Sequence, residues 1–121
     1  MKYLLLVHHN EVAFNMIPEG KRKEMLAESI QLCHQLDAKR QYVHASPLQP
    51  EAATTVVRVR NGKSVVTDGP FVETKEQLAG YFLIEAMDQG DAIRIAGLIP
   101  GARIGTVEVR PVKEIVGLPG E

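Results

Sequence analysis

The amino-acid sequence predicts one α+β domain spanning residues 1–121, built on an antiparallel sheet with two helices. Apolar runs of strand length alternate with two amphipathic helical patterns. Their order along the chain is strand, helix, strand, then a hairpin, then strand, helix, strand. Setting aside hairpin residues 54–67 leaves the βαββαβ order of a ferredoxin-like fold, so we expect that fold with an inserted β-hairpin.

The first half of the chain supplies the first strand–helix–strand unit. Residues 2–8 are a nearly continuous apolar run, which is typical of a strand covered on both faces. Residues 10–17 are expected to form a loop. The Pro18-Glu19 pair suits a helix start, and apolar residues three or four apart continue that helix to about Asp37. A second strand is predicted at residues 41–45, ahead of prolines. The apolar helix positions are Leu26, Ile30, Cys33 and Leu36.

The hairpin is the clearest local signal. Residues 54–60 alternate between valine or threonine on one side and valine or arginine on the other. Asn61-Gly62 follows, and a type I′ turn needs positive φ at both of its central positions, which these two residues tolerate. The return strand is predicted at residues 63–67.

The second unit begins with a strand at residues 81–86. Gly80, just before it, is expected to permit a bulge or a close approach of chains. A helix is predicted at residues 88–99 because Pro100-Gly101 ends its apolar stripe. The last strand is predicted at residues 103–110, followed by an irregular tail.

Composition excludes several classes of function. The formal net charge of −1 gives no electrostatic footprint for nucleic acid or an anionic membrane. No apolar run approaches the ~20 residues of a membrane span, and the start of the chain does not resemble a signal peptide. The single cysteine excludes an internal disulfide. We therefore expect a cytoplasmic protein without nucleic-acid or membrane partners, and we expect no cofactor.

Polar residues around the turn at residues 68–70 are the main candidates for chemistry. Asp68 begins this turn, and Glu73 and Lys75 follow it. A carboxylate beside a lysine at the mouth of a cleft can perform acid–base chemistry or hold a small ligand. In the alternative interpretation Asp68 caps its own turn and the other charges are solvated. Tyr81, in the next strand, is a further candidate ligand contact.

The histidines lack the spacing of a metal site. His8 ends the first strand and His44 lies in the second. If those strands are neighbours, the two imidazoles lie in one region, where they could provide a general base or a ligand contact. Alternatively, each is a polar side chain at a sheet edge.

The chain resembles the YCII-related family, in the branch named for its DGPF motif. The likeness is carried by Val66-Thr-Asp-Gly-Pro-Phe71, Glu73-Thr-Lys-Glu76 and Val107-Glu-Val-Arg-Pro-Val112, in that order. The resemblance implies a ferredoxin-like homodimer whose sheets face each other in a dimeric α/β-barrel arrangement.

The resemblance supplies no settled activity. Better-known members of the wider superfamily carry a proposed histidine–aspartate pair, but the histidine position aligns with about Ser29 here and the aspartate is absent. If the protein is an enzyme, Asp68 and His44 are the first candidates for catalytic residues. The candidate ligand contacts are His8, Glu73, Lys75 and Tyr81. We therefore expect a small-molecule enzyme or ligand-binding protein with a polar cleft near Asp68. The alternative is a non-catalytic module acting in trans with an extracytoplasmic-function sigma factor, because related domains occur beside or fused to such factors.

Overall fold

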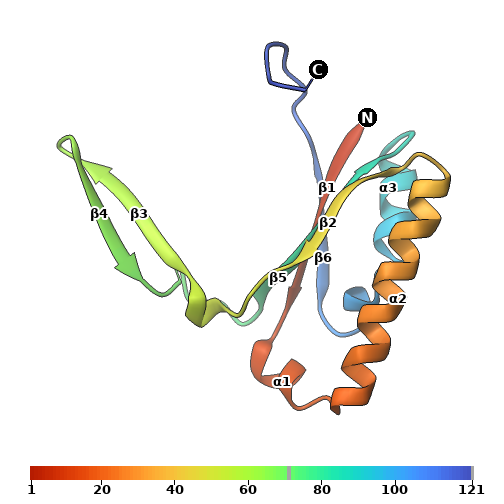
Figure 1. Cartoon of the computed structure of the whole chain (residues 1–121), viewed down its shortest axis with the longest axis horizontal. Helices are drawn as coiled ribbons and strands as arrows, with labels where there is room; N and C mark the ends of the chain where they lie inside the picture. The colour runs from red at the N-terminus through yellow and green to blue at the C-terminus, as the bar shows by residue number, and fades with distance from the viewer. Residues whose placement is uncertain (71, 121) are drawn as a thin grey trace.

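The computed structural model describes residues 1–70 and 72–120, which form a mixed α+β structure (Figure 1). The main sheet is four-stranded and antiparallel, with the spatial order β2-β5-β1-β6. Helices α2 and α3 lie on one face of it. The arrangement is compatible with the ferredoxin-like fold that the sequence predicts. The elements are β1 (Lys2–His9), α2 (Glu19–Ala38), β2 (Tyr42–Pro47), β5 (Gln77–Glu85), α3 (Gln89–Ala96) and β6 (Thr106–Pro111).

The core lies between the sheet and the two helices. Side chains alternate along β1, so that Tyr3, Leu5 and Val7 are buried while their neighbours are less so. Leu5 and Ile84 are completely inaccessible to solvent. The opposite face of the sheet is covered by no helix among the described residues, and we call it the open face. The helices and the following turn contribute Leu32, Leu36, Ala92, Ile95, Ala96 and Ile99 to the core.

A short helix, α1 (Glu11–Asn15), lies where the sequence was expected to give a loop, so that expectation was wrong. The Asn10 side chain accepts a hydrogen bond from the Ala13 amide at 2.9 Å and caps this helix. Glu11 places a negative charge in its first turn. A good capping residue and a favourable charge stabilise a single turn that is too short to show periodicity.

Strand β5 begins four residues before the predicted start at Tyr81 because backbone pairing with β1 extends it to Gln77. Val7 pairs with Gly80 and His8 pairs with Leu78, so the register shifts by one residue and Ala79, next to Gly80 on β5, is the extra residue of the expected bulge. A Cβ atom at Gly80 would lie 2.9 Å from the Ser46 carbonyl oxygen, so the expected close approach of chains is also present.

Three other predicted boundaries are corrected. Strand β2 continues to Pro47, which an edge strand tolerates. Helix α3 ends at Ala96 instead of residue 99, and a 3₁₀ turn, η2 (Pro100–Arg103), follows. Strand β6 therefore begins only at Thr106. Gly105 precedes it, and any side chain there would collide with the His8 carbonyl group.

The start of α3 is held by Asp91, whose side chain is only 6% exposed. Its carboxylate accepts hydrogen bonds from the Gln41 side-chain amide at 2.9 Å and the Met87 backbone amide at 3.1 Å. Arg94 also donates to it, at 2.9 Å. The Met87 amide, followed by Arg94, holds the pKa of Asp91 below its usual value. One side chain thus joins α3 to the ends of β2 and β5.

Strands β3 (Thr55–Arg60) and β4 (Lys63–Asp68) form a separate two-stranded sheet, which we call the arm. Asn61 and Gly62 both have positive φ, 52° and 75°, which confirms the turn that the sequence predicts. The arm projects from the main sheet on the side away from the helices (Figure 1). A 3₁₀ turn, η1 (Glu51–Ala53), precedes it.

Candidate functional site

A pocket of about 230 Å³ lies between α2 and the main sheet. Its walls come from the inner faces of β1, β2 and β5, from α1 and α2, and from the η2 turn. Most of the lining is apolar, which is the usual composition of small-molecule sites. The volume corresponds to about eight water molecules at ~30 Å³ each, so the pocket suits a small ligand. The apolar lining includes Val7, Phe14, Met25, Leu26, Ile30, Ala45, Phe82, Ile99 and Ile104.

His9 contributes an imidazole to the lining of this pocket. Its ring stacks on Phe14, with 4.3 Å between ring centroids and 15° between planes. Burial of the ring lowers the pKa of His9, against the opposing effect of Glu11 and Glu76. The imidazole is therefore neutral at pH 7, with one nitrogen that donates a hydrogen bond and one that accepts.

Arg22 and Ser29 are further polar residues of the lining. The Arg22 guanidinium carbon lies 5.9 Å from the centre of the Phe14 ring, and its Nε donates to the Ile17 carbonyl at 3.0 Å. The Ser29 hydroxyl donates to the Met25 carbonyl at 3.0 Å and keeps its lone pairs available to a ligand.

Cys33 also lines the pocket, and burial raises the pKa of its thiol. A neutral thiol in apolar surroundings is a poor nucleophile. The Arg22 guanidinium contacts the Phe14 ring and the Ile17 carbonyl, and the rest of the lining is uncharged, with His9 as the group best suited to acid–base chemistry.

Two hydrogen-bonded pairs lie on the open face, and one of their members, the predicted residue Tyr81, is also among the residues that line the pocket. The Tyr81 hydroxyl and His44 Nδ1 are 2.8 Å apart, so these two predicted residues are brought together. His8 Nε2 donates to Glu108 at 3.0 Å, and this bond is the main cause of the lowered pKa of Glu108. The strands of His8 and His44 are not neighbours, because β5 lies between them.

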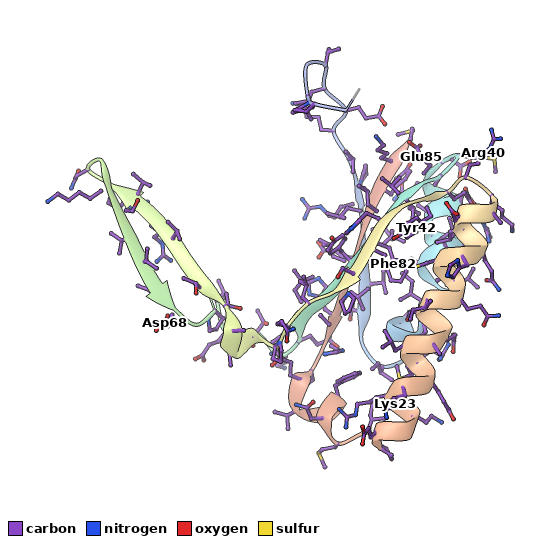
Figure 2. The ribbon with its side chains drawn as sticks, in the orientation of Figure 1. Lys23, Arg40, Tyr42, Asp68, Phe82 and Glu85 are labelled. Carbon is purple, nitrogen blue, oxygen red and sulfur yellow. The ribbon has the colours of Figure 1, made fainter. Side chains whose placement is uncertain are left out.

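The other predicted residues lie around the arm. Asp68 is exposed at the end of β4, apart from Tyr42 and Phe82 of the main sheet (Figure 2). Glu73 and Lys75 are exposed in the connection to β5, and the Lys75 carbonyl accepts from Asn10 at 2.9 Å. Phe71 of the DGPF motif lies outside the described residues.

An open hollow of about 570 Å³ lies at the base of the arm, next to the turn at residues 68–70. Its lining is mostly uncharged, with Glu51 as its ionisable side chain, and it includes neither Asp68 nor Lys75. The remaining lining residues are Leu48, Gln49, Pro50, Ala53, Thr54, Pro70, Val72, Thr74, Gln77 and Leu78.

The interpretation from sequence missed His9, Phe14 and Arg22. Alternation along the first strand gave the one available signal, because His8 and His9 must point to opposite faces. Phe14 was missed because residues 10–17 were expected to form a loop. Arg22 lies in the predicted helix, where a basic residue gives no separate signal for a site.

Within residues 1–70 and 72–120, no group of three or more His, Cys, Asp or Glu side chains is placed to hold a metal ion. In the same part of the chain, no helix has the length and apolar character needed to cross a membrane.

Fold and pocket together define a small α+β protein, compatible with a ferredoxin-like fold, that has an apolar pocket between sheet and helix. A family model, the YCII-related domain, matches residues 1–116, so the chain belongs to the YCII-related family. The chain is also 39% identical, over 82 residues, to an uncharacterized protein of Rhizobium meliloti (strain 1021). That match covers 61% of this chain and 66% of the relative, so the chain spans just under two thirds of the relative's length.

Proposed function

We propose that this protein binds a small, uncharged, largely apolar molecule in the pocket between α2 and the main sheet. The observation that carries the proposal is an apolar pocket of about 230 Å³ with the partly buried imidazole of His9, whose pKa is lowered by that burial, in its wall. Apolar walls provide affinity through burial of the ligand, and a single polar group fixes its orientation. A ring with one hydroxyl or carbonyl group matches this arrangement.

The same geometry supports an enzymatic role. A neutral imidazole can remove a proton from a ligand that carries an acidic O–H or C–H bond. The pocket also contains Ser29, the position that aligns with the proposed catalytic histidine of the wider superfamily. His9 would then supply, from β1, an imidazole that α2 lacks at Ser29.

Two probes of the same shape test the pocket. In NMR titrations, p-cresol should bind more tightly than toluene because its hydroxyl can pair with His9. His9→Phe retains an aromatic ring on Phe14 but removes both nitrogens, so the preference for p-cresol should disappear. His34→Phe is the matched control, because His34 is exposed on α2 and does not line the pocket. Absence of binding by either probe, or an unchanged preference in His9→Phe, would refute the proposal.

We also propose a homodimer that forms through the open face in a dimeric α/β-barrel arrangement. Leu4, Leu6 and Leu83 lie on this face by strand alternation, and none of them is fully buried. Uncovered leucines on a sheet are typical of a surface that meets a second copy. Sedimentation showing a stable ~13 kDa species at micromolar concentration would contradict this proposal.

A ligand role for Asp68 is a second proposal, supported by the hollow beside its turn and by the resemblance to the DGPF branch. Asp68→Asn keeps the size of the side chain and removes its charge. Affinity for a ligand bound in that hollow should fall. Unchanged affinity would leave Asp68 as a residue that only shapes the turn. If no small molecule binds at either place, the role in trans with a sigma factor becomes the better interpretation.

A further inference from the structure

Among the described residues, Arg22 is the one that brings a permanent charge to the lining of the pocket between α2 and the main sheet. Its Nε donates to the Ile17 carbonyl, and its guanidinium lies against the Phe14 ring. No carboxylate of the described residues forms an ion pair with it. Arg22 is partly buried, so its positive charge loses hydration without gaining a counter-ion. An anion in the pocket would supply the missing partner.

The pocket also places this charge near the imidazole of His9. The Arg22 guanidinium carbon lies 5.9 Å from the centre of the Phe14 ring, which lies 4.3 Å from the centre of the His9 ring. Because these two distances add to about 10 Å, the guanidinium lies no farther than that from the imidazole. At an effective dielectric constant of about 20, a unit charge at that distance favours an anion about tenfold. A ligand bonded to His9 therefore lies within the field of Arg22.

The other titratable groups around the pocket act more weakly on a ligand. Glu11 and Glu76 raise the pKa of His9, but less than burial lowers it. Neither of these carboxylates lines the pocket; one accepts from the first amide of η1 at 2.7 Å and the other from the hydroxyl that begins β6 at 2.8 Å. The Cys33 thiol is neutral because burial raises its pKa, and the Tyr81 hydroxyl is hydrogen-bonded on the open face. Arg22 is thus the charge that a bound ligand meets in the lining.

We propose that the pocket takes a weak O–H or C–H acid, such as a phenol or an enolisable carbonyl compound, and holds it as its anion through Arg22. This inference rests on the proposed binding function and adds the chemical class of the ligand. The ligand enters uncharged. Its O–H or C–H bond breaks, the electron pair stays on the ligand, and the proton passes to the free ring nitrogen of His9. Apolar walls without Arg22 would favour the uncharged form instead.

The probe p-nitrophenol tests the inference, because its phenol and phenolate forms absorb at different wavelengths. In a spectrophotometric pH titration with wild-type protein, the bound probe should show a phenolate-to-phenol ratio about tenfold higher than the free probe at the same pH. Addition of p-cresol should release the probe, which shows that the probe occupies the pocket. A bound ratio equal to or below the free ratio, or no binding of p-nitrophenol where p-cresol binds, would overturn the inference.

Three variants identify the source of the shift. Arg22→Met keeps the aliphatic length and removes the charge, so the bound ratio should fall below the free ratio. Arg22→Lys keeps the charge and should retain most of the shift. Lys21→Met is the matched control and should change nothing, because Lys21 is exposed on the same helix and does not line the pocket.

The outcomes separate this inference from the proposed function. A ratio in Arg22→Met equal to that of wild type would overturn the role of Arg22 and leave the binding of p-cresol standing. Failure of p-cresol and toluene to bind would overturn the proposed function itself, and this inference with it. The titration of the wild-type chain decides the inference even if a variant does not fold.

Discussion

Replacing Asp91 with alanine should destabilise the fold by about 3 kcal/mol. The change removes the acceptor of the Gln41 side-chain amide and the Met87 backbone amide. Hydrogen bonds to a charged group are each worth about 1.5–3 kcal/mol, and both donors here are only partly buried, so the lower end applies to each. Arg94 is 52% exposed and adds little, because an exposed ion pair contributes below about 1 kcal/mol.

The effect is measured by urea unfolding followed by circular dichroism, with thermal melts alongside. A loss of about 3 kcal/mol should lower the melting temperature by on the order of 10 °C for a domain of this size. Asp88→Ala in the same turn is the control. Asp88 caps the helix by accepting from the Asp91 amide, and loss of a cap costs about 1 kcal/mol. Equal losses in the two variants, or a loss below about 1 kcal/mol for Asp91→Ala, would refute the reasoning.

The pH dependence gives a second check. The pKa of Asp91 is lowered in the folded state, chiefly by the Met87 amide, so the unfolded chain takes up this proton first as the solution is acidified. The stabilisation is complete above about pH 4 and is lost as the pH falls through the folded-state pKa. The difference between wild type and Asp91→Asn should therefore shrink below about pH 4.

Three further predictions concern the turn, the pocket and metals. Gly62→Val should destabilise the arm by about 1–2 kcal/mol because its φ of 75° strains a β-branched residue, and unchanged hydrogen exchange across residues 55–68 would exclude this. Burial lowers the pKa of His9, so the unfolded state binds its proton first. Wild type should then lose stability relative to His9→Phe as the pH falls below about 6.5, and parallel urea midpoints across that range would contradict the assignment. Dialysis against a chelator should leave the melting temperature unchanged, whereas a large drop would reveal a structural metal.

The order of strands and helices was readable from sequence because alternation and apolar spacing report directly on burial. The hairpin turn was also readable, since Asn61-Gly62 satisfies a local backbone requirement without help from the rest of the fold. Gly80 signalled the bulge and close approach for the same local reason. The first residues of β5 and β6 were misplaced because backbone pairing with β1 determines where these strands begin. No residue near Gln77 or Thr106 signals that pairing locally.

The pocket was harder to predict than the fold. Its lining comes from many separate segments, and its apolar residues are indistinguishable in sequence from those of the core. In sequence, His9 is a second polar residue at the end of a strand. It becomes a candidate site residue only because the Phe14 ring of α1 stacks on it in the pocket wall. The polar residues near Asp68 attracted attention because charge is conspicuous in sequence, yet the arm holds Asp68 away from the pocket.

The arm joins the rest of the chain at a closed base, where the Gly69 amide donates to the Thr54 carbonyl at 2.9 Å. The chain segments that lead into β3 and out of β4 therefore lie side by side, and the arm is connected to the rest of the chain at this one place. Substitutions along it change no side chain that lines the pocket between α2 and the sheet. Substitutions in the arm can therefore change its surface without altering the pocket. For the same reason, the arm can be shortened or replaced as a unit in an engineered protein.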